Sequence, residues 1–392
     1  MQIECIDMWY LKEPVVEDIG DGSQDALIIR LNLSGHIGWG ECEAAPLTTV
    51  AAMFAPMSHA ACKPIFYDLV GRDISGPESI KKLSSEVKRN TMDHLQAPHA
   101  WSGIEMALWD ALGKAVETPV WELLGYKVSH GKRPYASSLF GETPEETYYK
   151  GKEIRDKGFF AAKFGWAQFG MNDLSSDVQQ LHAAREGIGP DLDLFIDAGQ
   201  IFEGRFEEAK ERLSALEKVK AGWFEEPFGG QSYASYSALK RCTTIRLAGG
   251  EASHSYEMAI NCIEYGSVDV IQIDCGRIGG IWPATEVAKY AQKKKIQFVN
   301  HTFTSHLALS ASLQPFAGIH EYNICEYPSN PKPLAREIAG EVLLPSANTL
   351  IYAPESPGLG VEVNIETLKK YSQNVKIEVS GKILYETPVI DS

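Results

Sequence analysis

From about residue 134 onward, short apolar runs alternate with segments that are mostly amphipathic and helical in pattern. The runs are 134–140, 159–164, 192–197, 222–225, 246–250, 269–273, 296–300 and 322–326. Strands of this length that alternate with helices are typical of βα units and a parallel sheet. Eight such units predict an α/β fold of the TIM-barrel type, in which active-site residues lie at the carboxyl ends of the strands.

The first 130 residues follow a different pattern. Residues 26–33 alternate enough to form a strand, Ser34-Gly35 is a turn signal, and residues 37–42 complete a predicted hairpin. Residues 102–114 place apolar side chains at the spacing of one buried helical face. We therefore expect an α+β domain over 1–130, a barrel over 131–354, and a final segment, 355–392, that returns to the first domain.

Composition narrows the possible functions. The chain has 392 residues and a formal net charge of −15, which argues against binding to nucleic acid or to a membrane surface. Its apolar stretches are too short to span a bilayer. The first residues lack the features of a secretion signal, and the seven scattered cysteines are typical of reduced thiols, so we expect a cytoplasmic protein.

Three acidic residues each close an apolar run in the middle of the chain. Asp197 and Glu225 are 28 positions apart, and Glu225 and Glu251 are 26 apart, about the length of one strand, one helix and two loops. Consecutive parallel strands would bring the three carboxylates to one mouth of the barrel. Like charges that are close together need a counter-ion, and oxygen ligands suit a hard divalent cation. We therefore predict a Mg²⁺ site.

Other ionisable residues end further strands of the predicted barrel. Lys163, Asp274, His301 and Glu326 occupy such positions, so seven of the strand ends carry a charged or titratable side chain. A single Asp or Lys at a strand end is often only a cap or a solvated residue. One per strand in the same register indicates a functional site.

These segments together resemble the enolase superfamily, in particular its mandelate racemase-like branch. The resemblance covers nearly the whole chain and lies in the helix at 104–114, PVWELLG, FIDAGQ, WFEEP, GGE, IQIDCGRIGG, VNH, CEYP and PGLGVEV. It implies a modified (β/α)7β TIM-type barrel with an α+β capping domain. It also implies Mg²⁺ bound by Asp197, Glu225 and Glu251, with Glu226 behind these ligands.

The resemblance also implies catalytic roles. Asp274 and His301 correspond to a His-Asp dyad, and Glu326 to a residue that donates a hydrogen bond to an enolate oxygen. Relatives often carry Lys-x-Lys on the second strand, whereas this chain has Lys163 alone, with Ala161 and Gly165 on either side of it. Lys163 is then a base whose pKa is lowered by burial and Mg²⁺, or a ligand of the substrate carboxylate.

Several residues near these motifs are candidate substrate contacts. Trp166 follows the second strand, Arg277 lies in DCGRIGG, and His254 follows GGE. The loops at 17–23 and 43–61 are expected to act as lid and specificity elements.

The site predicts an enzyme that acts on a small α-protonated carboxylate. We expect a Mg²⁺-dependent lyase that dehydrates an acid sugar, an aldonate or aldarate, to a 2-keto-3-deoxy acid. A racemase, epimerase or lactone cycloisomerase would use the same enolate, and a non-catalytic ligand-binding barrel is a third reading. The resemblance further suggests a homo-oligomer.

Overall fold

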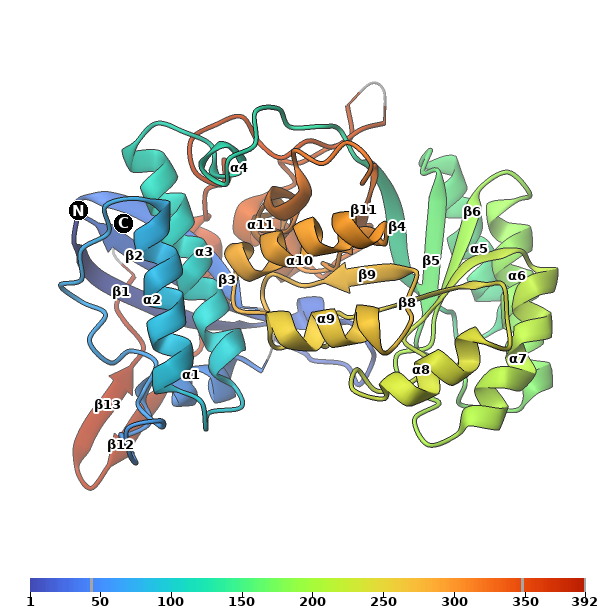
Figure 1. Ribbon diagram of the computed structural model, residues 1–392, viewed down its shortest axis with the longest axis horizontal. Helices are drawn as coiled ribbons and strands as arrows, with labels where there is room; N and C mark the ends of the chain where they lie inside the picture. Colours follow the sequence, from blue (N-terminus) through green and yellow to red (C-terminus); the bar gives the residue numbers. More distant parts are fainter. Residues whose placement is uncertain (43–44, 347–348, 391–392) are drawn as a thin grey trace.

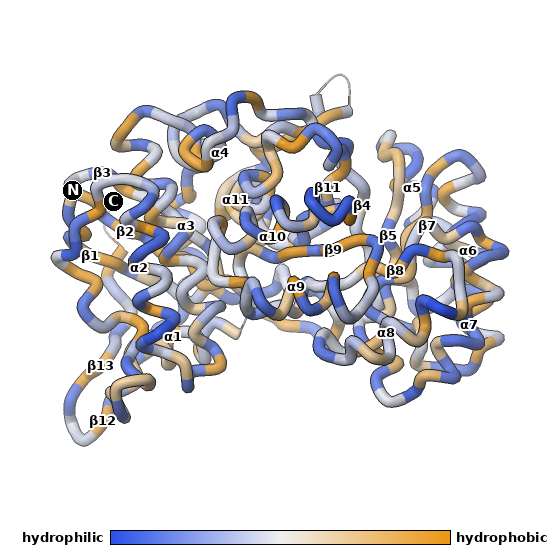
Figure 2. The backbone as a smooth tube through the Cα atoms, viewed as in Figure 1, coloured by the Kyte–Doolittle hydropathy of each residue, from blue (hydrophilic) through white to orange (hydrophobic). Residues whose placement is uncertain are grey.

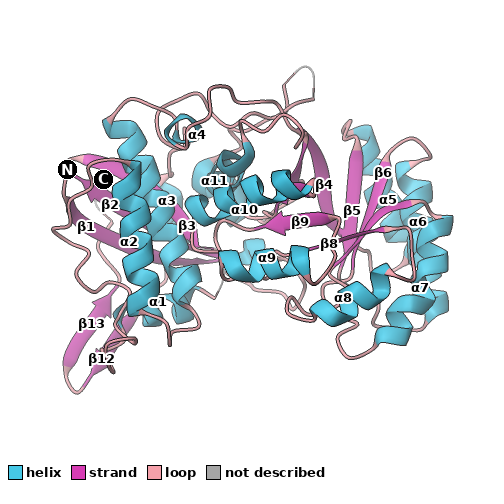
Figure 3. Ribbon diagram, in the orientation of Figure 1, coloured by secondary structure: helices cyan, strands magenta, loops and turns pink. Residues whose placement is uncertain are grey.

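The computed structural model describes residues 1–42, 45–346 and 349–390. In it an antiparallel sheet with its helices stands beside a parallel barrel (Figures 1 and 3). The barrel strands are β4 (Arg133–Leu139), β5 (Ala161–Gly165), β6 (Asp193–Asp197), β7 (Ala221–Glu225), β8 (Arg246–Gly249), β9 (Val270–Ile273), β10 (Gln297–Asn300) and β11 (Ile324–Pro328). They confirm the eight predicted runs with small shifts at their ends.

The strands are joined by seven helices, which confirms the (β/α)7β order. These are α5 (Pro144–Asp156), α6 (Leu174–Ile188), α7 (Phe206–Lys218), α8 (Tyr233–Lys240), α9 (Tyr256–Glu264), α10 (Ile281–Lys294) and α11 (His306–Leu313). The parallel ladder runs β10-β9-β8-β7-β6-β5-β4-β11. At the remaining seam, the Asn300 side chain bonds the backbone of Glu326: its Nδ2 donates to the carbonyl (3.2 Å) and its Oδ1 accepts from the N–H (3.0 Å). The barrel is therefore nearly closed.

One hydrophobic cluster fills the barrel, and a second, larger one surrounds it. Inside, Tyr135, Phe195 and Trp223 pack with small and branched residues of the other strands, and the rings of Phe195 and Trp223 stack with centroids 3.5 Å apart. The larger cluster lies between the strands, the outer helices and the first domain. In Figure 2 the strands β8 and β9 are mainly hydrophobic, whereas the outward turns of α6 and α7 are hydrophilic. Because the interior below the strand ends is packed, the polar side chains gather at the carboxyl ends.

The capping domain is built on the sheet β1 (Ile3–Lys12), β2 (Asp25–Leu33) and β3 (His36–Cys42). Its helical elements are η1 (Gly22–Gln24), α1 (Pro46–Phe54), α2 (Pro77–Asn90), α3 (Ala97–Ala115) and α4 (Val120–Leu123). The hairpin formed by β2 and β3 matches the prediction, and β1 is an additional strand. A Cβ at Gly40 of β3 would lie 2.0 Å from the carbonyl oxygen of Gly103 in α3, so the missing side chain lets helix and sheet approach closely.

Helix α3 joins the cap to the barrel, and it is buried on nearly every side rather than on one face as expected. Its polar residues explain the difference. The Glu105 carboxylate accepts hydrogen bonds from the N–H groups of Ile281 (2.6 Å) and Trp282 (2.9 Å), the first residues of α10. A buried carboxylate that accepts free N–H groups at a helix N-terminus is stabilised there.

Helix α12 (Pro333–Ala339) follows β11, and the final segment from residue 355 contains α13 (Ile365–Tyr371) and the hairpin β12 (Lys376–Val379) and β13 (Lys382–Glu386). The final segment runs along β1. The N–H of Gln373 donates to the carbonyl of Tyr10 (2.8 Å), and the hydroxyl of Tyr385 donates to the carbonyl of Met8 (2.7 Å). The chain thus returns to the cap, with the β12–β13 hairpin projecting at the lower left of Figure 1.

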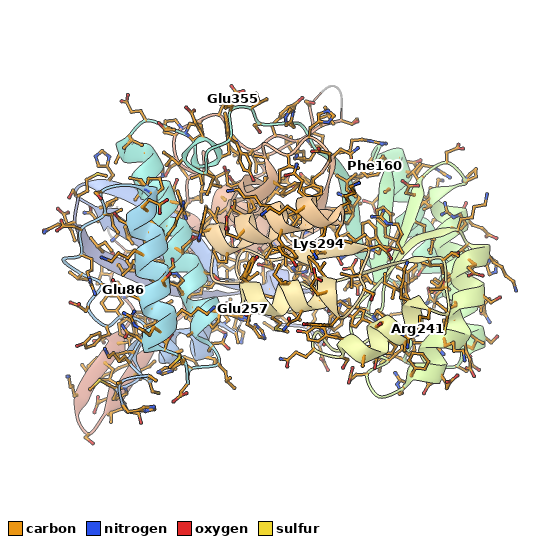
Figure 4. The ribbon with its side chains drawn as sticks, in the orientation of Figure 1. Glu86, Phe160, Arg241, Glu257, Lys294 and Glu355 are labelled. Atoms are coloured by element: carbon orange, nitrogen blue, oxygen red, sulfur yellow. The ribbon has the colours of Figure 1, made fainter. Side chains whose placement is uncertain are left out.

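The outer surface also links the two domains. Lys88 of α2 forms an ion pair of 2.8 Å with Glu257 of α9, which is labelled in Figure 4. Both side chains are exposed, so this pair stabilises the interface less than the buried bonds of Glu105 do. No helix in the described ranges is both long and apolar enough to cross a membrane.

Candidate active site

The seven predicted strand-end residues lie at the carboxyl end of the barrel. Lys163 lies in β5 and Glu326 in β11; Asp197 and Glu225 are the last residues of β6 and β7. Glu251, Asp274 and His301 follow β8, β9 and β10 directly or within two residues. All seven are buried, and they form one charged network that consists of two sets of ion pairs, one around Lys163 and one around His301. A cavity of about 440 Å³ opens over this network.

The ammonium of Lys163 lies among three carboxylates. Its Nζ is 2.5 Å from Glu225 Oε1, 2.8 Å from Glu326 Oε1 and 3.7 Å from Asp197 Oδ2. Burial alone would lower the pKa of Lys163, but the charges of Glu225 and Glu326 outweigh burial and raise the pKa well above its usual value. In this arrangement Lys163 is a counter-cation, and the lowered pKa expected for it beside bound Mg²⁺ stays a prediction.

Negative charge is in excess around this lysine. Burial, followed by the charge of Glu225, raises the pKa of Asp197 well above its usual range. The pKa of Glu225 is also raised, mainly by burial. Its second oxygen accepts a hydrogen bond from the indole N–H of Trp223 at 2.8 Å, which fixes the carboxylate.

Glu251 stands on the opposite side of the cluster, between two cationic groups. Its Oε1 is 3.2 Å from Arg277 Nη1 and its Oε2 is 3.3 Å from His301 Nε2. Burial would raise the pKa of Glu251, but the charges of His301 and Arg277 outweigh it and lower the pKa to about 2. Glu251 is thus ionised at any physiological pH.

Asp274 and His301 form the expected dyad. His301 Nδ1 lies 2.7 Å from Asp274 Oδ2, and Asp274 Oδ1 accepts from the N–H of Gly276 at 2.5 Å. Burial would lower the pKa of His301, but Glu251 and the hydrogen bond to Asp274 raise it to about 10. With Nδ1 held by Asp274, the other ring nitrogen is the one that exchanges protons.

Glu326 accepts rather than donates in this arrangement. Its Oε1 faces the Lys163 ammonium at 2.8 Å and its Oε2 accepts from the N–H of Thr302 at 2.9 Å. Both oxygens therefore face positive hydrogen atoms. The predicted role of Glu326 as a donor to an enolate oxygen stays a prediction.

The donor set fits a hard divalent cation in its chemistry. Asp197, Glu225 and Glu251 offer only carboxylate oxygens, from neighbouring strands. Burial is the main cause of the raised pKa values of Asp197 and Glu225, and repulsion between the carboxylates, which a cation would relieve, adds to it. Within the described part of the chain, no three His, Cys, Asp or Glu side chains are already arranged as a metal cage. Lys163 supplies the positive charge there instead. Glu226, the residue after Glu225, accepts from Gln200 Nε2 at 2.7 Å and does not line the cavity.

Trp166 lies between the barrel and the loop over residues 17–23 of the capping domain, here called the cap loop. A Cβ at Gly20, in the loop over residues 17–23, would lie 2.9 Å from the indole, and one at Gly199, after β6, would lie 2.6 Å from it. The indole therefore lies between these two glycines. Trp166 and Arg277 both line the cavity, as do Ile19, Gly20 and Asp21 of the cap loop. In the second expected lid loop, residues 43 and 44 lie outside the described residues, and residues 45–61 do not border the cavity.

Two interactions near the site involve residues outside the predicted motifs, His99 and Glu41. His254 does not line the cavity; its Nδ1 lies 2.8 Å from Nε2 of His99 in α3. Glu41 of β3 is buried behind the dyad, where Ser305 donates a hydrogen bond to it. Burial raises the pKa of Glu41 to about 7. No local pattern identifies Glu41, because its partner is 264 positions away in the chain.

Comparison with known proteins agrees with this geometry. Residues 150–368 match the family described as enolase C-terminal domain-like, and residues 5–125 match the mandelate racemase/muconate lactonizing enzyme N-terminal domain. The chain belongs to the enolase superfamily, in its mandelate racemase/muconate lactonizing enzyme group. Members of this superfamily bind Mg²⁺.

Three relatives show the range of this family. A crystal structure described as a predicted mandelate racemase from Rhodobacter sphaeroides is 51% identical, with a TM-score of 0.93, and the match covers 99% of this chain and 100% of that one. D-galactonate dehydratase of Variovorax paradoxus is 30% identical over 361 residues, 87% of this chain and 89% of the relative. D-galactarolactone cycloisomerase of Agrobacterium fabrum is 27% identical over 354 residues, 86% of this chain and 88% of the relative.

Proposed function

We propose that the protein dehydrates an acid sugar, an aldonate or aldarate, to a 2-keto-3-deoxy acid. The observation that carries the proposal is one cavity bordered by two of the predicted metal ligands, Asp197 and Glu251, and by two proton-carrying side chains, Lys163 and His301. The dehydratase among the relatives supports the same reaction class.

The reaction needs a strongly stabilised enolate, because the proton next to a carboxylate is very weakly acidic. Asp197, Glu225 and Glu251 would hold Mg²⁺, which supplies the positive charge that stabilises the enolate. With the carboxylates neutralised by a cation, the main cause of the raised pKa of Lys163 is removed and the effect of its burial remains. Lys163 then becomes more suitable as a base.

His301 and Lys163 move the protons. Lys163, or His301 itself, takes the proton from C2, and the electron pair of the C–H bond forms the enolate. The C3 hydroxyl leaves with a proton from His301 Nε2, so one water is released, and the resulting enol tautomerises to the 2-keto acid. Asp274 holds the imidazole in the orientation that this step requires.

Two substitutions test these roles. Glu251→Gln removes a carboxylate from the proposed metal set with little change in shape, and we expect turnover to fall by about 10² or more. Undiminished turnover would show that the metal assignment is wrong. His301→Asn keeps a polar group but no acid, and it should abolish elimination; unchanged dehydration would remove His301 from the acid role.

A cycloisomerase or epimerase is the second candidate. Two proton carriers in one cavity can remove and return a proton at the same carbon as well as expel a hydroxyl, and one relative is a lactone cycloisomerase. Mass spectrometry of the product separates the two functions. A dehydratase yields a product lighter by one water, whereas an isomerase yields a product of unchanged mass.

A further inference from the structure

The cavity extends beyond the reacting residues to an outer wall that differs from them in charge. This outer wall is formed by α5, by the segment from Pro328 to Arg336 and by the cap loop at 19–21. It carries four cationic side chains, Lys150, Lys157, Lys332 and Arg336, and two carboxylates, Asp21 and Glu153. On a chain with a net charge of −15, a local excess of positive charge is unusual.

Two of the four cations are already paired. Lys157 forms an ion pair with Glu153 at 2.8 Å, and Lys332 pairs with Glu17 of the cap loop. Among the ion pairs of the residues that the structure describes, none involves Lys150 or Arg336. These two cations therefore remain, together with one carboxylate of the outer wall, Asp21, which likewise forms no ion pair with a described residue.

Lys150 is held in position by the barrel itself. Its Nζ donates to the carbonyls of Leu139 (3.1 Å) and Phe140 (3.2 Å), at the carboxyl end of β4. An ammonium has three N–H donors, so one remains for a ligand. Burial lowers the pKa of Lys150, with Glu146 and Glu142 opposing the shift, which means that its charge is poorly solvated and gains from an anion.

We propose that Lys150 and Arg336 form a subsite for a second anionic group, at the end of the acid sugar remote from the carboxylate that is enolised. The inference rests on the proposed function and specifies its substrate class. The inner residues bind the reacting carboxylate, and the outer wall selects chains that end in another anion. A terminal carboxylate and a terminal phosphate ester share the required chemistry, so substrates of both kinds enter the test.

The test compares kcat/KM for an aldarate and for the aldonate of the same configuration. Lys150→Met and Arg336→Gln should each lower kcat/KM for the aldarate by about tenfold or more, as expected for loss of a hydrogen bond to a charged group, and change the aldonate value by less than about twofold. Lys152→Met is the matched control, because Lys152 lies on the same helix but is exposed and does not border the cavity. It should leave both values unchanged.

The outcomes separate this inference from the proposed function. Equal effects on both substrates, or none, overturn the subsite while dehydration stands. If no acid sugar is turned over, the proposed function fails, and titration calorimetry with the aldarate and aldonate still tests the subsite through binding. A preference for the 6-phosphate ester of the aldonate over the aldarate supports the subsite and assigns its anion to phosphate. Thermal unfolding of the Lys150 variant, with Arg336→Gln as the second variant, separates lost recognition from lost folding.

Discussion

Lys163 is the residue on which the charge balance of the site depends. Its ammonium contacts Glu225 and Glu326 directly and lies near Asp197, so it neutralises part of a buried acidic cluster. A buried charge left without its partner typically costs about 3–5 kcal/mol. Lys163 therefore has a structural role in the absence of a divalent cation as well as a proposed role in proton transfer.

Lys163→Met should reveal both roles. With a chelator present, we expect the free energy of unfolding in urea to fall by about 3–5 kcal/mol, and Mg²⁺ should stabilise the variant more than the parent. Turnover should fall by about 10² to 10⁴. Lys210→Met is the control, since Lys210 pairs with Glu207 on the exposed face of α7. Equal stability of the Lys163 variant and the parent in chelator would contradict the counter-cation role.

Gly165 is one of the two positions, with Ala161, at which a second lysine of the Lys-x-Lys pattern would stand. A Cβ at this position would lie 2.7 Å from the Cβ of Asp197, so any side chain there displaces a proposed metal ligand. Gly165→Ala should weaken Mg²⁺ binding by about tenfold or more, measured by titration calorimetry. Gly76→Ala, where a Cβ meets nothing within 4 Å, should bind Mg²⁺ as the parent does. Unchanged affinity in the Gly165 variant would show that Asp197 is not positioned by this contact.

Whether the position of a site residue could be predicted from the sequence depends on how far away in the chain its partners are. The strand-end register brought Asp197, Glu251 and His301 to one mouth because consecutive parallel strands share an orientation. The partners of His254, Glu41 and Lys150 were not predictable, since each depends on how a loop, a strand of the cap or a long side chain packs against distant residues. The charge state of Lys163 also required the three-dimensional arrangement, because it is set by carboxylates from three other strands.

At the scale of elements, α3 is joined to the barrel by a histidine pair. Gln96 Nε2 lies 3.3 Å from Nδ1 of His99 and donates to it, so His99 in turn donates from Nε2 to His254 Nδ1 at 2.8 Å. This chain of bonds needs a neutral His99. Burial, followed by the charges of His254 and Arg277, lowers the pKa of His99 to about 4, although Asp274 acts in the opposite direction.

The lowered pKa predicts a dependence of stability on pH. Because the unfolded chain takes up a proton on His99 near pH 6.5 and the folded chain does so only near pH 4, stability is lost as the pH falls through this window. One such proton accounts for at most about 1.4 kcal/mol per pH unit. His99→Gln should reduce the slope of unfolding free energy against pH between 6.5 and 4, measured by urea unfolding. His182→Gln, on the exposed side of α6, is the control, and equal slopes for all three proteins would exclude this contribution.

Much of the element pattern was readable from the sequence. The eight strands and the β2–β3 hairpin were predicted because each has a clear apolar run or turn signal. Strand β1 was not, since its burial does not alternate strictly along Ile3–Lys12. Helix α3 was predicted with one buried face, and its buried Glu105 accepts not only from Trp109 of the same helix but also from the N-terminus of α10, more than 170 positions later.

At the scale of the whole molecule, the cap and the barrel form the cavity together. The barrel contributes the acidic cluster, the dyad and Lys163, and the cap loop contributes Ile19, Gly20 and Asp21 to the wall. We therefore expect the substrate class to depend on both domains and the proposed chemistry to depend on the strand ends. This separation agrees with relatives that include both a dehydratase and a cycloisomerase on the same fold.

Loss of water from an enolate is what distinguishes the proposed dehydration from isomerisation. The most direct test is proton NMR of the protein with Mg²⁺ in D2O against a set of aldonates and aldarates. We predict a new C3 methylene signal, partly deuterated, together with the keto acid. Exchange of the C2 proton with the sugar skeleton retained would contradict dehydration and favour an epimerase, and no exchange with any acid would contradict the enolate itself.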